Sequence, residues 1–156
     1  MVVREYLGLI DRLDSMHRNK LTELSQLKMM EYALSGVRYD VDKVQTSPNQ
    51  DPLATSVAKV LDIEAETNEI IMKLLKTKQE IIAEIDRISN TELYKVLTMR
   101  YIQFKSNKEI ANELECSRQK VDSLMSEAHL EFDRKYHFLY DHISQNDYIV
   151  ALFESV

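Results

Sequence analysis

Residues that interrupt helices are nearly missing from this chain of 156 residues. It contains only two glycines, Gly8 and Gly36, and only two prolines, Pro48 and Pro52. Turns and β-hairpins depend on these residue types, and helix interiors disfavour them. Because no glycine or proline follows Pro52 and Leu, Ile, Glu and Lys are abundant, the sequence predicts an all-α fold.

Other residue types and motifs that the sequence lacks exclude several classes of function. The single cysteine, Cys116, excludes an intramolecular disulfide and a Cys-based zinc site. No signal peptide or long apolar run occurs, so we expect an intracellular protein that does not span a membrane. We also find no Ser/His/Asp set, phosphate-binding loop or metal-ligand cluster. The sequence therefore predicts a protein that is not an enzyme and that needs no cofactor or metal.

The net charge of −6 is unevenly distributed along the chain. Residues 1–90 carry 12 basic and 15 acidic side chains, residues 91–135 carry 8 of each, and residues 136–156 carry 3 acidic and no Lys or Arg. Nucleic-acid binding depends on basic side chains that contact phosphates. The central segment is the least acidic, but its attraction for one DNA site is expected to be modest.

Two long helices are predicted in residues 1–90. Apolar residues recur at helical spacing over residues 3–35 and again over 53–88, with the connector 37–52 between them. The second helix has a nearly heptad seam formed by Val60, Ile63, Thr67, Ile70, Leu74, Thr77, Ile81, Ile85 and Ile88. Such a seam packs on the first helix as an antiparallel hairpin, on a second copy of the chain, or on both. We expect a hairpin that also drives self-association.

A helix-turn-helix pattern spans Asn107 to Leu130. Ser106 is a predicted N-cap that forms a capping box with Glu109, and Ser117 is a second N-cap after a very short turn. Ala111 is a small residue over which a second helix can cross closely. These features are typical of the motif that places its second helix in the DNA major groove.

The helix predicted over residues 91–102 completes a three-helix module of residues 91–135, with Leu93, Val96, Leu97 and Tyr101 facing inward. Glu115 stands in the turn where glycine is usual, so either Glu115 adopts the left-handed conformation or the turn is built differently. Eight candidate DNA contacts follow from this arrangement: Lys108, Ser117, Arg118, Gln119, Lys120, Asp122, Ser123 and Ser126. Arg pairs well with guanine and Gln with adenine. The alternative interpretation is an ordinary helical hairpin with a solvated polar face.

The last segment, residues 136–156, is rich in apolar and aromatic side chains. This is too much apolar surface to leave in water. We expect an extension of the preceding helix and a short second helix, folded onto the helix-turn-helix module or into a subunit interface.

The layout resembles a known family. Leu93–Ile102, Lys108–Ser117 and Val121–Ala128 are similar to region four of bacterial sigma factors, and the whole chain resembles phage late-transcription regulators of the RinA/ArpU type. In that type an N-terminal helix, a Ser-x-Asn-x-Asp-Pro connector and a long central helix precede the module, and here the connector motif is Ser47–Pro52. The resemblance covers roughly residues 4–135.

This resemblance implies a DNA-binding activator of phage or prophage genes. By matching position it points to Ser117, Arg118, Gln119, Lys120 and Ser123 as DNA contacts. The apolar tail after Arg134 departs from the pattern of the family.

The first functional hypothesis is therefore a sequence-specific transcription regulator that binds double-stranded DNA as a homo-dimer or higher oligomer. Because the chain has no excess of basic residues, we expect a second copy or a partner such as host RNA polymerase to supply additional affinity for DNA. The alternative is a DNA-packaging or assembly protein such as a small terminase subunit. The two hypotheses differ in assembly, since a promoter-binding dimer contrasts with a ring of many subunits.

Overall fold

The computed structural model describes residues 1–36 and 52–154 of the chain, and these ranges contain α-helices and no β-strand. The all-α prediction is confirmed. The described ranges contain six α-helices, which are α1 (Val3–Gly36), α2 (Pro52–Asp86), α3 (Thr91–Leu97), α4 (Asn107–Glu113), α5 (Arg118–Tyr136) and α6 (Gln145–Glu154). None of them is both long and apolar enough to cross a membrane. The predicted connector motif falls outside the described residues, except for Pro52 at its end.

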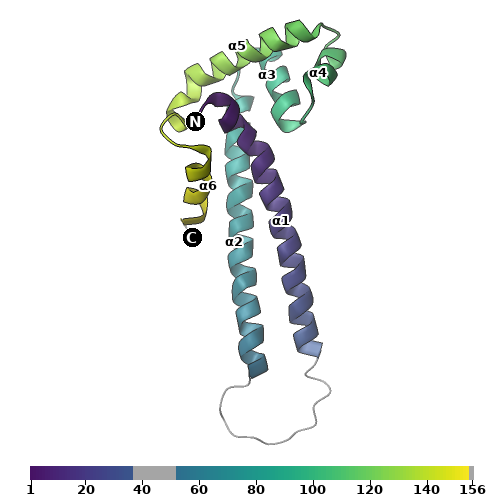
Figure 1. Cartoon of the computed structure of the whole chain (residues 1–156), viewed down its shortest axis with the longest axis vertical. Helices are drawn as coiled ribbons and strands as arrows, with labels where there is room; N and C mark the ends of the chain where they lie inside the picture. The colour runs from purple at the N-terminus through teal and green to yellow at the C-terminus, as the bar shows by residue number, and fades with distance from the viewer. Residues whose placement is uncertain (37–51, 155–156) are drawn as a thin grey trace, which may run out of the picture.

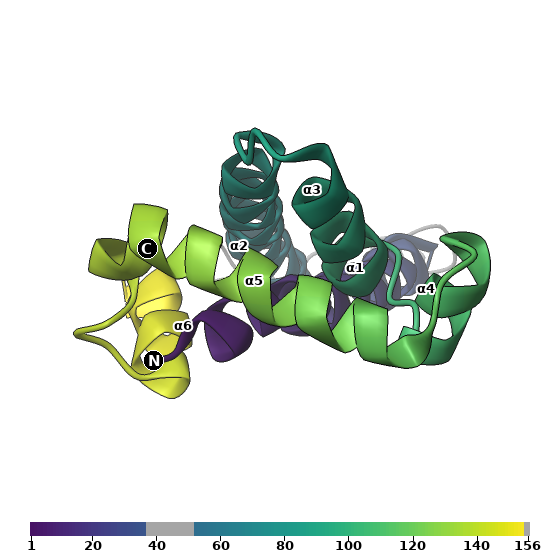
Figure 2. The ribbon, with the colours of Figure 1, turned by 90° about the horizontal axis from the view of Figure 1, so that it is seen from above.

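The two long helices α1 and α2 run side by side in opposite directions and form an elongated stem (Figure 1). Ion pairs join them along their length, between Asp14 and Lys78 and between Lys28 and Glu64, the latter at 3.4 Å. The helices α3, α4 and α5 form a head at one end of the stem. Seen from above, α5 crosses over the start of α1, and the end of α2 lies beside it (Figure 2).

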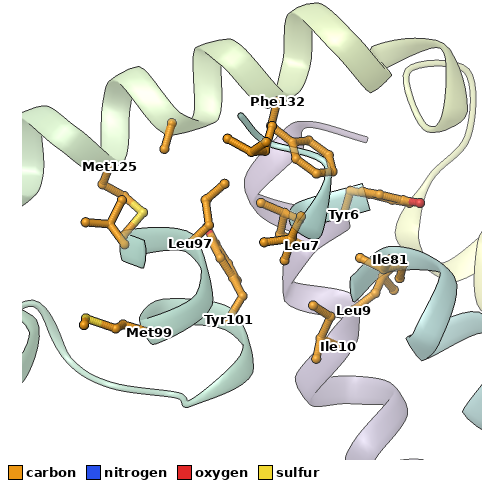
Figure 3. Packing of buried hydrophobic residues seen from close by; sticks show 14 of the residues in the cluster. Tyr6, Leu7, Leu9, Ile10, Ile81, Leu97, Met99, Tyr101, Met125 and Phe132 are labelled. Carbon is orange, nitrogen blue, oxygen red and sulfur yellow. The ribbon is translucent and has the colours of Figure 1, made fainter. Parts of the chain in front are cut away.

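The core lies where the stem meets the head. Leu7 and Ile10 of α1, Ile81 of α2 and Phe132 of α5 are fully buried. Figure 3 shows Phe132 pointing from α5 toward Leu7, with Tyr6 alongside. Burying a large apolar side chain stabilises a fold by about 1.5–3 kcal/mol. This cluster therefore joins the stem and the head into one packed unit.

The predicted seam of α2 is buried only in part. Its residues Thr67, Leu74, Thr77, Ile81 and Ile85 are buried within the chain, but Ile63 is 43% exposed. The buried part faces α1 and the head, so it is not free to contact a second copy. Self-association through α2 stays a prediction, and the buried residues of this seam are not available for it because the chain itself covers them.

The helix predicted over residues 91–102 is present but changes character midway. Asn90 caps α3 by accepting hydrogen bonds from the backbone N–H groups of Glu92 and Leu93. The chain then forms a π-helical turn, Thr98–Ile102, in which Gln103 N donates to Thr98 O at 3.0 Å. The wider turn still directs Met99 and Tyr101 inward. Leu93, Val96, Leu97 and Tyr101 are all buried, as the sequence predicted.

The C-terminal tail packs on the upper stem. After α5 the chain forms a 3₁₀ turn, His137–Leu139, and then α6, which contacts α1 and α2. The Tyr140 ring is buried and stacks on Tyr6, with ring centroids 4.6 Å apart. The expected extension and short helix are present. The tail lies on the module only in part. Tyr140 stacks on Phe132 of α5, but α6 packs on the stem, because the length of α5 carries the chain past α3 and α4.

Candidate nucleic-acid interface

The first helix of the motif, α4, is fixed by a complete capping box. The Ser106 hydroxyl accepts a hydrogen bond from Glu109 N at 3.3 Å, and the Glu109 carboxylate accepts one from Ser106 N at 2.8 Å. The hydrogen bond donated by the Ser106 side chain keeps the pKa of Glu109 below its usual value. The predicted cap is confirmed. It matters because a helix of seven residues is too short to be stable by propensity alone.

In the turn between α4 and α5, the structure distinguishes between the two conformations that the sequence left open for Glu115. Its φ angle is 49°, so a non-glycine residue takes the left-handed conformation there. The next residue, Cys116, donates its backbone N–H to Ala111 O at 3.0 Å and closes the end of α4. The turn thus has the tight geometry of the motif without glycine.

The second helix, α5, is much longer than the motif requires. Ser117 caps it by accepting a hydrogen bond from Lys120 N at 3.1 Å, as predicted. Its inner face is buried along the whole length, and consists of Val121, Leu124, Met125, Ala128, His129, Phe132 and Tyr136. The first half of α5 packs with α4 and α3, and the second half lies over the stem (Figure 2).

All eight predicted contacts are exposed, and they surround the first half of α5. The helical repeat places Gln119, Ser123 and Ser126 in the middle of its outward face. Lys120 and Asp122 lie at the two borders of that face. The other three residues lie near the turn: Ser117 is the N-cap of α5, Arg118 begins that helix, and Lys108 lies in the first turn of α4.

Besides the cap residue Ser117, the side chains of Asp122 and Ser126 have hydrogen-bond partners within the chain. The Asn107 side chain donates a hydrogen bond to the Asp122 carboxylate at 2.6 Å and so links the start of α4 to α5. The Ser126 hydroxyl donates to the backbone carbonyl of Asp122 at 2.9 Å. Asp122 is therefore a brace between the two helices. Its carboxylate would also repel phosphates, which makes it the weakest candidate of the eight.

Lys120 faces a different neighbourhood from Asp122. It lines a hollow of about 260 Å³ between α3 and α5 together with Glu92, Lys95, Leu114, Cys116 and Leu124. Lys95 is exposed and adds a second positive charge on this side. A phosphate beside the α3 border of α5 would thus meet two ammonium groups.

On the other border the stem contributes residues that sequence analysis did not connect with the module. Arg4 and Gly8 of α1 line a cavity of about 520 Å³ together with Arg100, Tyr101, Asn107, Asp122, Met125 and His129. Arg4 and Arg100 are exposed, and Arg100 donates a hydrogen bond to Lys105 O at 3.1 Å. No local pattern in the sequence signals that Arg4 lies beside α5, because more than 100 residues separate them.

The imidazole beneath these arginines is uncharged. Burial, and then the positive charges of Arg4 and Arg100, lower the pKa of His129 to about 4. Its Nε2 atom lies 2.7 Å from the Tyr101 hydroxyl, whose own pKa is raised by burial. His129 therefore holds the core in place, and the positive charge at this border comes from the two guanidinium groups.

No group of three or more His, Cys, Asp or Glu side chains with the geometry to hold a metal ion occurs in the part of the chain that the structure describes. No curated protein matches the chain, and no solved structure matches it. A family model does: its description is "Protein of unknown function (DUF1492)", and it matches residues 33–133. The matched range contains α2 and the whole helix-turn-helix, whereas Arg4 and the tail lie outside it. Because this range covers well over half of the sequence, the chain belongs to the DUF1492 family.

Proposed function

We propose that this protein is a sequence-specific DNA-binding transcription regulator, acting on late genes of a phage or prophage in the cytoplasm of a bacterial host. It is a binding protein and not an enzyme. One observation carries the proposal. Two capped helices meet at a tight turn, and the first half of the second helix presents an exposed polar face. This is the arrangement by which a helix-turn-helix enters the major groove.

In the proposed complex the beginning of α5 lies in the major groove. Gln119 and Ser123 on the outward face and Arg118 at the tip meet base edges, where Arg pairs with guanine and Gln with adenine. Lysines and arginines at the borders contact phosphates on either side. These are Lys95 and Lys120 on one border, Arg4 and Arg100 on the other, and Lys108 at the start of α4.

The negative net charge of the chain limits its affinity for DNA. With a net charge of −6 and equal numbers of acidic and basic residues in the module, long-range attraction to DNA is weak for one copy. We propose that a second copy of the chain, or host RNA polymerase, supplies the remaining affinity. A low intrinsic affinity also favours specificity, since non-specific binding depends on phosphate contacts.

A titration on selected and scrambled DNA duplexes at several salt concentrations tests the proposal, once selection of bound genomic fragments has given a site. Replacing Arg118 by Ala should weaken binding to the selected duplex by about 1–3 kcal/mol and relax the preference at one base position. Arg134 is the matched control, because it is an exposed arginine near the far end of the same helix. Arg134→Ala should bind as the parent does.

The phosphate contacts are tested by a second pair of arginines, both on α1. Arg4→Ala should weaken binding to selected and scrambled duplexes equally, and reduce the salt dependence by about one unit of slope. Arg18→Ala, lower on the stem, should change neither. If Arg118→Ala binds both duplexes like the parent, α5 does not recognise bases. A ring of many subunits in solution would favour DNA packaging over transcription.

A further inference from the structure

Helix α2 carries two separate series of residues spaced by three and four. One series contains the buried residues that face α1 and the head. The second, which we call the outer seam, consists of Ala58, Leu61, Ala65, Asn68, Met72, Leu75, Gln79 and Ile82. Alternating steps of three and four place all eight on one side of the helix, and two coiled-coil helices meet through residues spaced in this way.

The outer seam is uncharged although α2 is a highly charged helix. Nine charged residues lie between Ala58 and Ile82, and none of them occupies a position of the seam. Water solvates a charged helix face readily, so an exposed face has no need to exclude charge. A face that packs against another helix does, because burying an unpaired charge is costly.

The rest of the described chain leaves most of the outer seam open. Leu61 is 46% and Met72 is 65% exposed, Leu75 and Ile82 are half-buried, and the other four residues are exposed. The seam lies about a third of a turn from the face that contacts α1. Glu64 and Lys78 mark the border between the two faces, since both form ion pairs with α1.

Charges along the other flank of the seam form a symmetric pattern. Along the helix they are Lys59, then the acidic segment Asp62, Glu66 and Glu69, then the basic segment Lys73 and Lys76, and last Glu80. Two copies of α2 packed in parallel would set acidic residues against acidic ones. In the antiparallel orientation, the acidic segment of each copy lies beside the basic segment of the other. The Lys76 side chain is 79% exposed, and its partner within α2 is Glu80 at 4.0 Å, so it can reach a second copy.

We propose that a second copy of this chain docks on the outer seam in the antiparallel orientation. Centred near residue 70, the arrangement sets Asn68 of each copy against Met72 of the other, and Ala65 against Leu75. The small and large side chains then alternate across the contact. On α1, the exposed residues Leu21, Met29 and Tyr32 line a hollow of about 470 Å³ with Lys28, which pairs with Glu64 at the border of the seam. They extend the apolar surface on that side.

This dimer determines where the two DNA-binding modules lie. Helix α2 has 35 residues, which corresponds to about 52 Å at 1.5 Å per residue. The two heads are therefore at opposite ends of the assembly. That separation is larger than the 34–36 Å between half-sites one helical turn apart. Each module then binds a site of its own, and adjacent half-sites of a short palindrome are not occupied together.

The mass of the full chain in solution, measured by sedimentation or light scattering, tests the dimer without any DNA. The result of this measurement does not depend on DNA binding, so failure of the dimer and failure of the proposed function can be distinguished. The dimer rests on the self-association proposed above and specifies its contact surface. The parent chain should have the mass of a dimer. The double variant Leu61→Glu/Met72→Glu should have the mass of a monomer, with its helix content unchanged because both side chains are exposed. The matched control is Leu130→Glu, since Leu130 is 59% exposed on α5, and it should remain a dimer.

A distance measurement tests the orientation. A spin label on Lys59→Cys, in a chain that also carries Cys116→Ser, should give an interlabel distance of about 30 Å, because residue 59 and its copy lie 22 residues apart along the antiparallel pair. A parallel pair would bring the two labels close together. The proposal is overturned if the parent is a monomer, if the double variant stays dimeric, or if the labels lie side by side.

Discussion

The two ends of the stem are built from similar residues and are buried to very different extents. At the upper end of α1, Leu7, Leu9, Ile10 and Leu13 are no more than 1% exposed. Farther along the same helix, Leu21 is 45% and Met29 is 71% exposed. Both regions belong to one continuous helix with an apolar stripe, so helix-forming tendency does not explain the difference.

The difference comes from the number of elements that surround each end. At the upper end α5 lies over the stem and α6 lies against its side, so a stem residue there has neighbours on several faces (Figures 1 and 2). Toward the other end the described chain provides two helices alone. Two helices bury only the stripe along which they touch. Along α1, burial therefore decreases with distance from the head.

The largest effect on stability is expected for Tyr140, the residue through which the C-terminal tail covers the upper end of the stem. Its ring is buried against Tyr6, and its hydroxyl donates a hydrogen bond to Asp133 at 2.8 Å. Tyr140→Ala should reduce the free energy of unfolding by about 3–5 kcal/mol in urea titrations. The neighbouring Phe138 is 59% exposed, and Phe138→Ala should change it by less than about 0.5 kcal/mol. Equal losses in the two variants would contradict the position of the tail.

The stability contributions of the two ends of the stem can be compared by replacing Leu with Ala at two positions of α1. Leu7→Ala should cost about 2–5 kcal/mol in free energy of unfolding, because it leaves a cavity in the closed core. Leu21→Ala, in a 45% exposed position, should cost less than about 1 kcal/mol. The measurement is urea unfolding followed by circular dichroism at a fixed protein concentration. A large loss for Leu21→Ala would mean that the second copy proposed above also covers this part of α1.

The buried histidine should make the upper end sensitive to acid. The pKa of His129 is lowered to about 4 in the folded chain, against an ordinary value of 6.5. Between these values the unfolded chain binds more protons, so stability is present above about pH 6.5 and is lost as the pH falls toward 4. We expect this loss to reach up to about 2 kcal/mol. His129→Gln should be less stable than the parent at pH 7, but its urea midpoint should fall less steeply between pH 6.5 and 4. An unchanged slope would show that His129 titrates as it does in water.

The smallest effect on stability is expected for the N-terminal cap of α4, a helix at the edge of the head. Ser106→Ala removes the capping box and should cost about 1 kcal/mol in free energy of unfolding. Ser123→Ala, on the exposed face of α5, should change stability by less than about 0.5 kcal/mol. If both variants unfold like the parent, the cap does not hold α4 in place.

Local features of the protein were predictable because they depend on neighbouring residues. The scarcity of glycine and proline predicted the helical class, and Ser106, Glu109 and Ser117 predicted both caps of the motif. The left-handed conformation of Glu115, one of two alternatives that the sequence left open, is also a local feature. Hydrogen bonds of caps and turns connect residues only a few positions apart, so one sequence contains the information that they need.

The tertiary structure decided the features that depend on distant residues. It placed Arg4 beside the first half of α5, brought Tyr140 onto Tyr6, and left Ile63 of the predicted seam exposed. The seam from Val60 to Ile88 indicated which face of α2 packs, but not which element covers each part of it. Burial is settled only when several helices pack at once, because apolar surface is buried by whichever element lies opposite it.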